Sequence, residues 1–232
     1  EYVKAIVEDD VYRMDGIKRD TNKMRLLLRS LARNESTTVT NRTLKNDVKE
    51  IDDEDIDANT INEYLNIFER LFLINNQKPF AASVRSSVRI KQAVKRHFVD
   101  PSISAALLGV TSSSLLNDLE TLGLLFEALC ERDLQIYADA FGGSLYHYQD
   151  YKNREIDAVV ECPDGEWCAF EIKLGANQID AAAEGLLRLK AEFEADPRGR
   201  PPKVLCVLCG LSNAAYQRPD GVFVVPLTAL RD

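Results

Sequence analysis

The sequence predicts a mixed α/β (α+β) chain in two parts, a helical domain over residues 1–100 and a mixed sheet flanked by helices over residues 101–232. Three observations predict this fold class. Apolar residues recur at helical spacing in segments before residue 71, and an extended segment follows them. From residue 115 onward, helical and strand-like segments alternate. An all-apolar strand over residues 204–209 follows a crossover helix, which indicates a partly parallel, covered sheet.

The composition is that of a folded chain without a membrane segment. Hydrophobic residues make up 45% and charged residues 28% of the sequence, both ordinary values for a globular protein. No apolar run approaches the roughly 20 residues of a membrane helix, and the first residues do not resemble a signal peptide. We therefore expect a cytoplasmic protein with no membrane partner. Because the chain begins with Glu rather than Met, we also expect it to be part of a longer protein.

The cysteines favour a reducing compartment. There are 5 of them, an odd number, at spacings that do not form a disulfide framework. Cys206 and Cys209 have the spacing of a metal or redox pair, but they lie in the apolar strand. Positions i and i+3 of a strand face opposite sides, so the two sulfurs would not converge. We expect thiols buried in the core.

Helical patterns dominate the first part. Residues 1–20 predict a short helix that needs a partner surface, and residues 22–33 predict a clearly amphipathic helix. Residues 41–48 predict another short helix, followed by an acidic loop over residues 50–55. The next helix begins at an N-cap, Asp57 or Asn59, and ends at Arg70. Residues 71–80 then become extended.

Three helices followed by an extended hairpin are the layout of a winged helix. Between Arg70 and Val99 the chain has seven basic residues and no acidic one, although the net charge of the whole is −8. Five of these basic residues would lie on or just after the wing, as DNA contacts: Arg85, Arg89, Lys91, Lys95 and Arg96. The alternative is a winged helix that contacts only protein, and Glu63 and Glu69 on the third helix favour it. Both interpretations remain open.

In the second part, the pattern predicts a short helix over residues 102–108 and a long buried helix over residues 115–132, with Glu127 in its apolar surround. A helix is also predicted over residues 178–195. The remaining segments are predicted strands, over residues 135–138, 144–149, 156–160, 167–174, 204–209 and 222–225.

The strands over residues 156–160 and 167–174 are joined by turn residues, Pro163-Asp164-Gly165, and form a predicted hairpin. Side chains alternate along a strand, so Glu171 and Lys173 share one face. In the expected register Asp157 lies near Glu171, and two carboxylates and one ammonium converge.

This cluster has a chemical interpretation. Two carboxylates bind a hard divalent cation through oxygen, and such a cation activates water and polarises a phosphoryl oxygen. Lys173 could then steady the water or the charge that develops at phosphorus. The alternative is a surface hairpin with an ordinary ion pair, because Glu-x-Lys is common in strands.

Glu127 on a helix, Asp157 on a strand and Glu171-Ile172-Lys173 on the next strand resemble the motif of the PD-(D/E)XK nuclease-like superfamily. The motif's proline is absent, since Ile156 precedes Asp157. The resemblance implies a restriction-endonuclease-like sheet in which Asp157, Glu171 and the Ile172 carbonyl bind Mg²⁺ or Mn²⁺. It also implies that Lys173 orients the water and that Glu127 completes the catalytic shell.

The whole chain also resembles the C-terminal region of prokaryotic AAA-type ATP-binding proteins, a domain-of-unknown-function region with a winged helix and a nuclease-like domain. The similarity rests on segments such as Phe98-Val99-Asp100-Pro101, Arg154-Glu155-Ile156-Asp157 and Ala169-Phe170-Glu171-Ile172-Lys173. It implies an upstream ATPase module as a partner, although this chain has no phosphate loop and hence no ATP site. Two functions follow: a metal-dependent DNA phosphodiesterase, or a scaffold that binds DNA or protein without catalysis.

Overall fold

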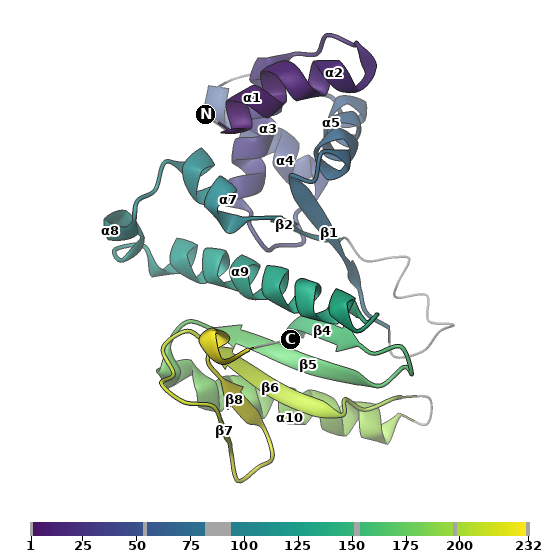
Figure 1. Cartoon of the computed structure of the whole chain (residues 1–232), viewed down its shortest axis with the longest axis vertical. Helices are drawn as coiled ribbons and strands as arrows, with labels where there is room; N and C mark the ends of the chain where they lie inside the picture. Colours follow the sequence, from purple (N-terminus) through teal and green to yellow (C-terminus); the bar gives the residue numbers. More distant parts are fainter. Residues whose placement is uncertain (1, 53–54, 82–93, 151–153, 197–198, 231–232) are drawn as a thin grey trace. The chain divides into compact units, whose positions relative to one another are not determined.

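The computed structural model describes residues 2–52, 55–81, 94–150, 154–196 and 199–230 (Figure 1). The chain divides into two compact units. The first unit comprises Glu1–Asn76 and Val94–Ala128, and the second comprises Gln77–Ala93 and Leu129–Asp232. This division differs from the predicted boundary at residue 100. None of the helices in the described ranges is both long and apolar enough to cross a membrane.

The first unit is built from helices. They are α1 (Tyr2–Ala5), the π-helical turn η1 (Ile6–Asp10), α2 (Val11–Asp15), α3 (Thr21–Arg33), α4 (Asn41–Asp52) and α5 (Ala58–Arg70). Asp20 caps α3 by accepting from the amides of Asn22 and Lys23. Asp57 caps α5 in the same way, so the first of the two predicted caps is confirmed. The acidic loop was predicted to begin at residue 50, but α4 continues through Asp52.

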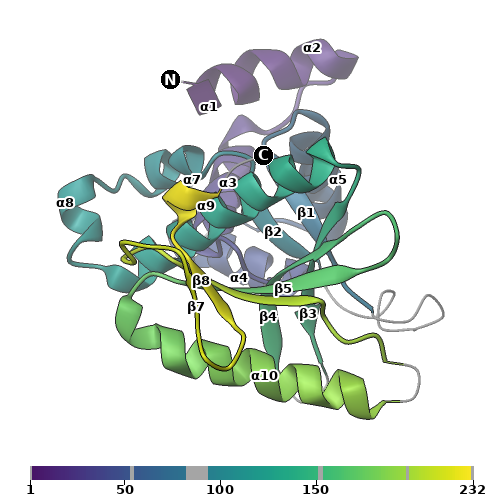
Figure 2. The same cartoon turned by 60° about the horizontal axis from the view of Figure 1, so that its bottom comes forward.

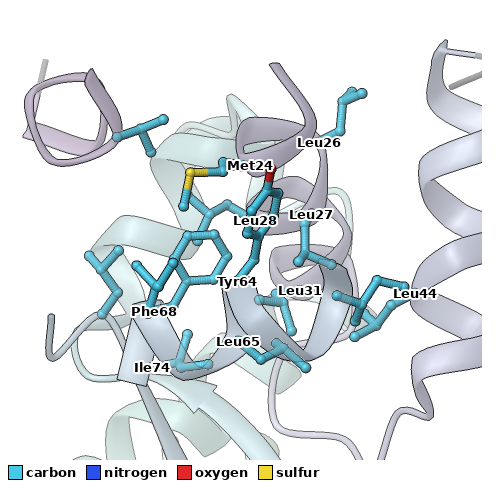
Figure 3. Packing of buried hydrophobic residues seen from close by; sticks show 14 of the residues in the cluster. Met24, Leu26, Leu27, Leu28, Leu31, Leu44, Tyr64, Leu65, Phe68 and Ile74 are labelled. Carbon is cyan, nitrogen blue, oxygen red and sulfur yellow. The ribbon is translucent and has the colours of Figure 1, made fainter. Parts of the chain in front are cut away.

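A continuous hydrophobic core holds these helices together (Figure 3). Met24, Leu27 and Leu28 of α3 and Phe68 of α5 have no exposed surface. They lie on the stripes that the helical spacing predicts, so the amphipathic pattern is confirmed. Burial of each large apolar side chain of this kind stabilises the folded state by roughly 1.5–3 kcal/mol.

A small hairpin follows the helices, with strands β1 (Ile74–Pro79) and β2 (Lys95–Phe98). The Arg96 amide also donates to the Thr37 carbonyl at 3.1 Å, which ties β2 to the loop after α3. Two short helices come next, α7 (Pro101–Leu108), capped by Asp100, and α8 (Ser112–Leu115). A helical region with a small hairpin is therefore confirmed.

Helix α9 (Leu119–Ala140) begins in the first unit and ends in the second. The predicted strand over residues 135–138 is wrong, because these residues form the last turns of α9. Glu131, Leu134 and Ala138 are buried at helical spacing. The helix stops before Gly142, which has a φ of +75°, a conformation that glycine adopts without strain.

The remaining strands are β3 (Ser144–Gln149), β4 (Glu155–Glu161), β5 (Trp167–Lys173), β6 (Val204–Cys209), β7 (Tyr216–Gln217) and β8 (Phe223–Val225). Within the described residues, eight strands form one sheet in the order β2-β1-β3-β4-β5-β6-β8-β7. The pairs β1–β3, β5–β6 and β6–β8 are parallel and the hairpins are antiparallel. The predicted mixed sheet is confirmed, although strand β7 was not predicted.

Helix α10 (Ile179–Ala195) covers one face of this sheet (Figure 2). Its Ala183 and Leu186 pack against Trp167 of β5 and Val207 of β6 in a second hydrophobic core. Trp167 also stacks edge-on against Phe193 near the end of the helix, with ring centroids 5.2 Å apart. Because residues alternate along β5, the face that holds Trp167 also holds Glu171 and Lys173. The candidate site therefore lies on the α10 face of the sheet.

Candidate metal centre

A register shift in β4 marks the position of Asp157. Tyr148 pairs with Ile156 but Tyr146 pairs with Val159, so β4 has one residue more than β3 across this interval. Such a bulge bends a strand and redirects a side chain. On the other side of β4, Ala158 pairs with Phe170, which brings Asp157 beside Glu171. The bulge thus coincides with the first acidic residue of the site.

Three charged side chains meet at this point. The ammonium of Lys173 lies 3.0 Å from Oδ2 of Asp157 and 2.8 Å from Oε2 of Glu171. The backbone amide of Ile172 also donates to Oδ2 of Asp157, at 2.7 Å. The two carboxylates are 13% and 14% exposed, so they are largely withdrawn from water. The convergence predicted from strand alternation is therefore present.

Burial of the two carboxylates shifts the pKa values of Glu171 and Lys173. Desolvation raises the pKa of Glu171 to about 8, helped by the charge of Asp157 and a hydrogen bond to it, and opposed by Lys173. For Lys173, desolvation alone would lower the pKa, but the two carboxylates outweigh it and raise the pKa above the ordinary value. The ammonium therefore stays charged, and Glu171 holds its proton more tightly than an exposed glutamate does.

An open hollow of about 380 Å³ lies directly over the cluster. Glu171 and Lys173 line it from the sheet. Asn177, Gln178, Ala181, Ala182 and Gly185 line it from the loop before α10 and from α10 itself. The side chains on the helix are small or uncharged, so the cluster is reached from solvent through this hollow.

The donor set fits a divalent cation that prefers oxygen. Mg²⁺ keeps several waters and binds through one or two carboxylates rather than through a full protein cage. Asp157 and Glu171 supply such a pair, and a divalent cation between two close carboxylates would relieve the repulsion between them. Among the described residues, no group of three or more His, Cys, Asp or Glu side chains converges. Asp157 and Glu171 would therefore hold the ion with the Ile172 carbonyl and water.

Glu127 lies in the first unit, on the N-terminal half of α9. There its carboxylate contacts the ammonium of Lys95, and both side chains are mostly buried. A buried pair of this kind is costly to break by removing one partner. Because Glu127 and the Asp157 cluster belong to different units, the expectation that Glu127 completes the metal shell stays a prediction.

The predicted DNA contacts divide into two groups. Arg85, Arg89 and Lys91 lie outside the described residues. Lys95 was expected on an exposed wing, but it is 6% exposed and paired with Glu127. Arg96 donates to the Val39 carbonyl at 2.9 Å, and burial lowers the pKa of its guanidinium. The side chains of Lys95 and Arg96 are thus used inside the first unit.

Two features of the site were not predicted from the sequence. The amide of Ile172 anchors Asp157, and the helix residues Ala181 and Gly185 form one wall of the hollow. The contact joins a backbone amide of β5 to a side chain of β4, and a pattern of residue types does not show which amide an acidic side chain will accept from. A glycine in the middle of an amphipathic helix, as at Gly185, is the signal that could have indicated the open wall.

Two matches cover most of the chain. Residues 1–114 match a domain of unknown function (DUF8612), and residues 122–230 match a second domain of unknown function (DUF4143). No curated protein and no solved structure matches the chain. The site described above lies within the second match, and the chain is thus similar to two domains of unknown function in tandem.

Proposed function

We propose that this chain contains a divalent-metal-dependent phosphodiesterase module that acts on DNA, normally joined to an upstream AAA-type ATPase. The observation that carries the proposal is the buried pair of Asp157 and Glu171 bridged by Lys173 on an open hollow. The PD-(D/E)XK-like order of an acid on one strand and Glu-x-Lys on the next supports the same chemistry. A bound Mg²⁺ or Mn²⁺ supplies a more acidic water and a polarised phosphoryl oxygen.

Each residue of the chain has a distinct task in this proposal. Asp157, whose Oδ2 accepts from the Ile172 amide, would be one ligand of the metal. Glu171 would be the second ligand and would give up its proton, because the cation would replace the charge that the proton supplies. Lys173, which contacts both carboxylates, would steady the attacking water or the charge on the phosphoryl oxygens.

A second function is a scaffold that binds DNA or protein without catalysis. The observation that favours it is the Lys173 bridge itself, because an ammonium between two carboxylates already satisfies them in the absence of metal. The helical region with its hairpin would then dock the partner, as winged helices do. The upstream ATPase would supply the chemistry.

Cleavage and metal binding separate the two functions. The wild type and the variants Asp157→Asn and Glu171→Gln are incubated with linear, circular and single-stranded DNA in Mg²⁺ or Mn²⁺. We expect cleavage by the wild type and loss of it in both variants, with little change in melting temperature. Glu161→Gln is the matched control, because Glu161 lies on β4 but pairs with Arg200 away from the cluster. A wild type that neither cuts DNA nor melts higher in Mn²⁺ would favour the scaffold.

A further inference from the structure

A second hollow lies next to the candidate metal centre, in the same unit. It has a volume of about 560 Å³ and is lined by Arg154 and Glu155 before and at the start of β4, and by Arg188 and Glu192 of α10. Gly185 lines both this hollow and the one over Glu171 and Lys173. The two hollows therefore meet at Gly185 and form one groove along α10.

Gly185 has no packing reason to be glycine. It lies within α10, where glycine is less favourable than alanine by roughly 1 kcal/mol. Its φ is not positive, and a Cβ added there would meet no atom within 4 Å. Glycine is often retained where another molecule approaches the backbone closely. A ligand that spans both hollows would pass over Gly185, because this residue lines both of them.

Arg188 is the group in the second hollow that favours an anionic ligand. Arg154 contacts the carboxylates of Asp150 and Glu192, so its single positive charge is already used and one negative charge is left over. Glu155 also lines the hollow, and it accepts a hydrogen bond from Gln149 at 2.5 Å. Arg188 is exposed, and in the described part of the chain it forms no hydrogen bond or ion pair. Its guanidinium is free to bind a phosphate.

The dimensions match a polymeric substrate. From Ala181 to Glu192 the wall of α10 runs for about 17 Å at 1.5 Å per residue. This length corresponds to several nucleotides of a phosphodiester chain, whereas a single small molecule would fill one hollow only. A phosphate at the metal centre and a flanking phosphate at Arg188 would then belong to one strand that passes over Gly185.

We infer that the groove along α10 binds a single nucleic-acid strand, with Arg188 as a phosphate-binding residue and Gly185 as the point of closest backbone approach. The inference rests on the proposed function for the identity of the ligand, but it concerns residues that do not touch the metal centre. It assigns α10 to substrate binding in addition to its role in covering the sheet.

The test measures binding of a fluorescein-labelled single-stranded oligonucleotide by anisotropy in EDTA, where a metal-dependent reaction cannot consume it. We expect Arg188→Gln to weaken binding about tenfold, the loss of one charge-assisted contact, and to reduce the salt slope by about 0.7. Lys190→Gln is the matched control, because it removes the same charge from the same helix but lies outside both hollows. We expect it to bind as the wild type does.

A second pair of variants tests the junction. Gly185→Leu should block the groove and weaken binding, whereas Gly123→Leu places the same side chain at a helical glycine of α9 that also has open space. The inference is overturned if the wild type does not bind the oligonucleotide, or if Arg188→Gln and Gly185→Leu bind as well as their controls. A groove that binds a protein instead of DNA would also leave the oligonucleotide unbound, and this result would overturn the inference.

Melting in Mn²⁺ on the same preparations keeps the two proposals apart. If the variants lose oligonucleotide binding but the wild type shows no shift with Mn²⁺ and no cleavage, the groove stands and the nuclease proposal fails. If Mn²⁺ binding and cleavage are present and the variants behave as their controls, the nuclease proposal stands and the groove fails.

Discussion

Lys173 contacts both carboxylates of the candidate metal centre, and substitution separates its two roles. If Lys173 is only a counter-ion, the Lys173→Ala variant has two close carboxylates with no positive charge between them. Its melting temperature should then fall, and it should recover when Mn²⁺ is added. As a catalytic group, its loss leaves metal and DNA binding nearly normal but lowers the cleavage rate by about 10²–10³. We expect the second result. Melting and cleavage are measured on the same preparations.

Lys203→Ala is the control for that substitution, because Lys203 pairs with a single exposed carboxylate, Glu166, at 3.0 Å. It should change neither the response to Mn²⁺ nor the cleavage rate. A Lys173→Ala variant that cuts DNA at the wild-type rate would rule out the catalytic role.

Glu171 makes the metal-free stability depend on pH. Its pKa is raised from 4.5 to about 8 in the folded chain, so the folded state holds the proton more tightly than the unfolded state does. Linkage then requires that this group's contribution to stability is lost as pH rises from about 4.5 through 8. In EDTA, the melting temperature of the wild type should fall relative to that of Glu171→Gln between these values.

The same linkage predicts that Mn²⁺ competes with a proton at Glu171. The increase in melting temperature caused by Mn²⁺ should be larger above pH 8 than near pH 6, because no proton must be displaced there. Parallel melting curves for wild type and Glu171→Gln across this range would contradict the raised pKa.

The sequence predicted which three charged residues form the cluster, Asp157, Glu171 and Lys173, and that their side chains lie close together. Strand alternation is a local property, so it is readable without the fold. The anchoring of Asp157 by the Ile172 amide and the protonation of Glu171 were not readable. The first depends on how β4 and β5 lie against each other and the second on burial of the cluster, and both are set by contacts between distant segments.

The end of α5 has an unusual residue. Phe72 occupies the left-handed position with a φ of +54°, and the amides of Phe72 and Leu73 donate to the carbonyls of Glu69 and Phe68. This pattern ends helices and normally has glycine at that position. Phe72 is 78% exposed, so little burial compensates for its strained backbone.

We therefore predict that Phe72→Gly stabilises the chain by about 1 kcal/mol, because glycine adopts the left-handed conformation without the Cβ penalty. The corresponding rise in melting temperature is about 2–4 °C for a chain of this size. Phe72→Ala is the control, since it removes the ring but keeps the Cβ, and should give little or no rise. An equal rise in both variants would place the effect in the ring rather than in the backbone.

The elements that the sequence predicted well are those with strong periodicity. Their apolar patterns are long or strictly alternating, so each pattern fits only one type of secondary structure. These elements are helices α3 and α5 and strands β4, β5 and β6. The segment over residues 135–138 was misassigned because four residues fit a short strand and a helical turn equally. Its membership of α9 depends on the buried positions of Leu134 and Ala138.

For the whole molecule, charge distribution gives the next prediction. The net charge is −8, yet residues 1–100 have 18 basic and 17 acidic residues. If the basic stretch after β1 contacts DNA, log K should fall by about 0.9 per log unit of salt for each duplex phosphate contact. The paired substitution Arg85→Gln with Arg89→Gln should reduce that slope. Neutralising Lys4 of α1 and Arg13 of α2 should leave that slope unchanged. Affinity that is independent of salt would favour a protein partner.

Strand order across the sheet was only partly predictable. A parallel component followed from the apolar strand over residues 204–209, and β5–β6 confirms it. The edge pair of β7 and β8 was not predicted, because Tyr216–Gln217 is too short to show a period. The division into compact units likewise depends on contacts made by α9 and β1, which a sequence pattern does not contain.

The position of a bound metal decides whether Asp157 and Glu171 form a metal centre. Crystals of the wild type grown with Mn²⁺ would show its anomalous signal. We predict a peak between Asp157 and Glu171, about 2.1 Å from a carboxylate oxygen of each, with the Lys173 ammonium displaced from its bridging position. A map without that peak, in which Lys173 still contacts both carboxylates at saturating Mn²⁺, would contradict the metal-dependent function.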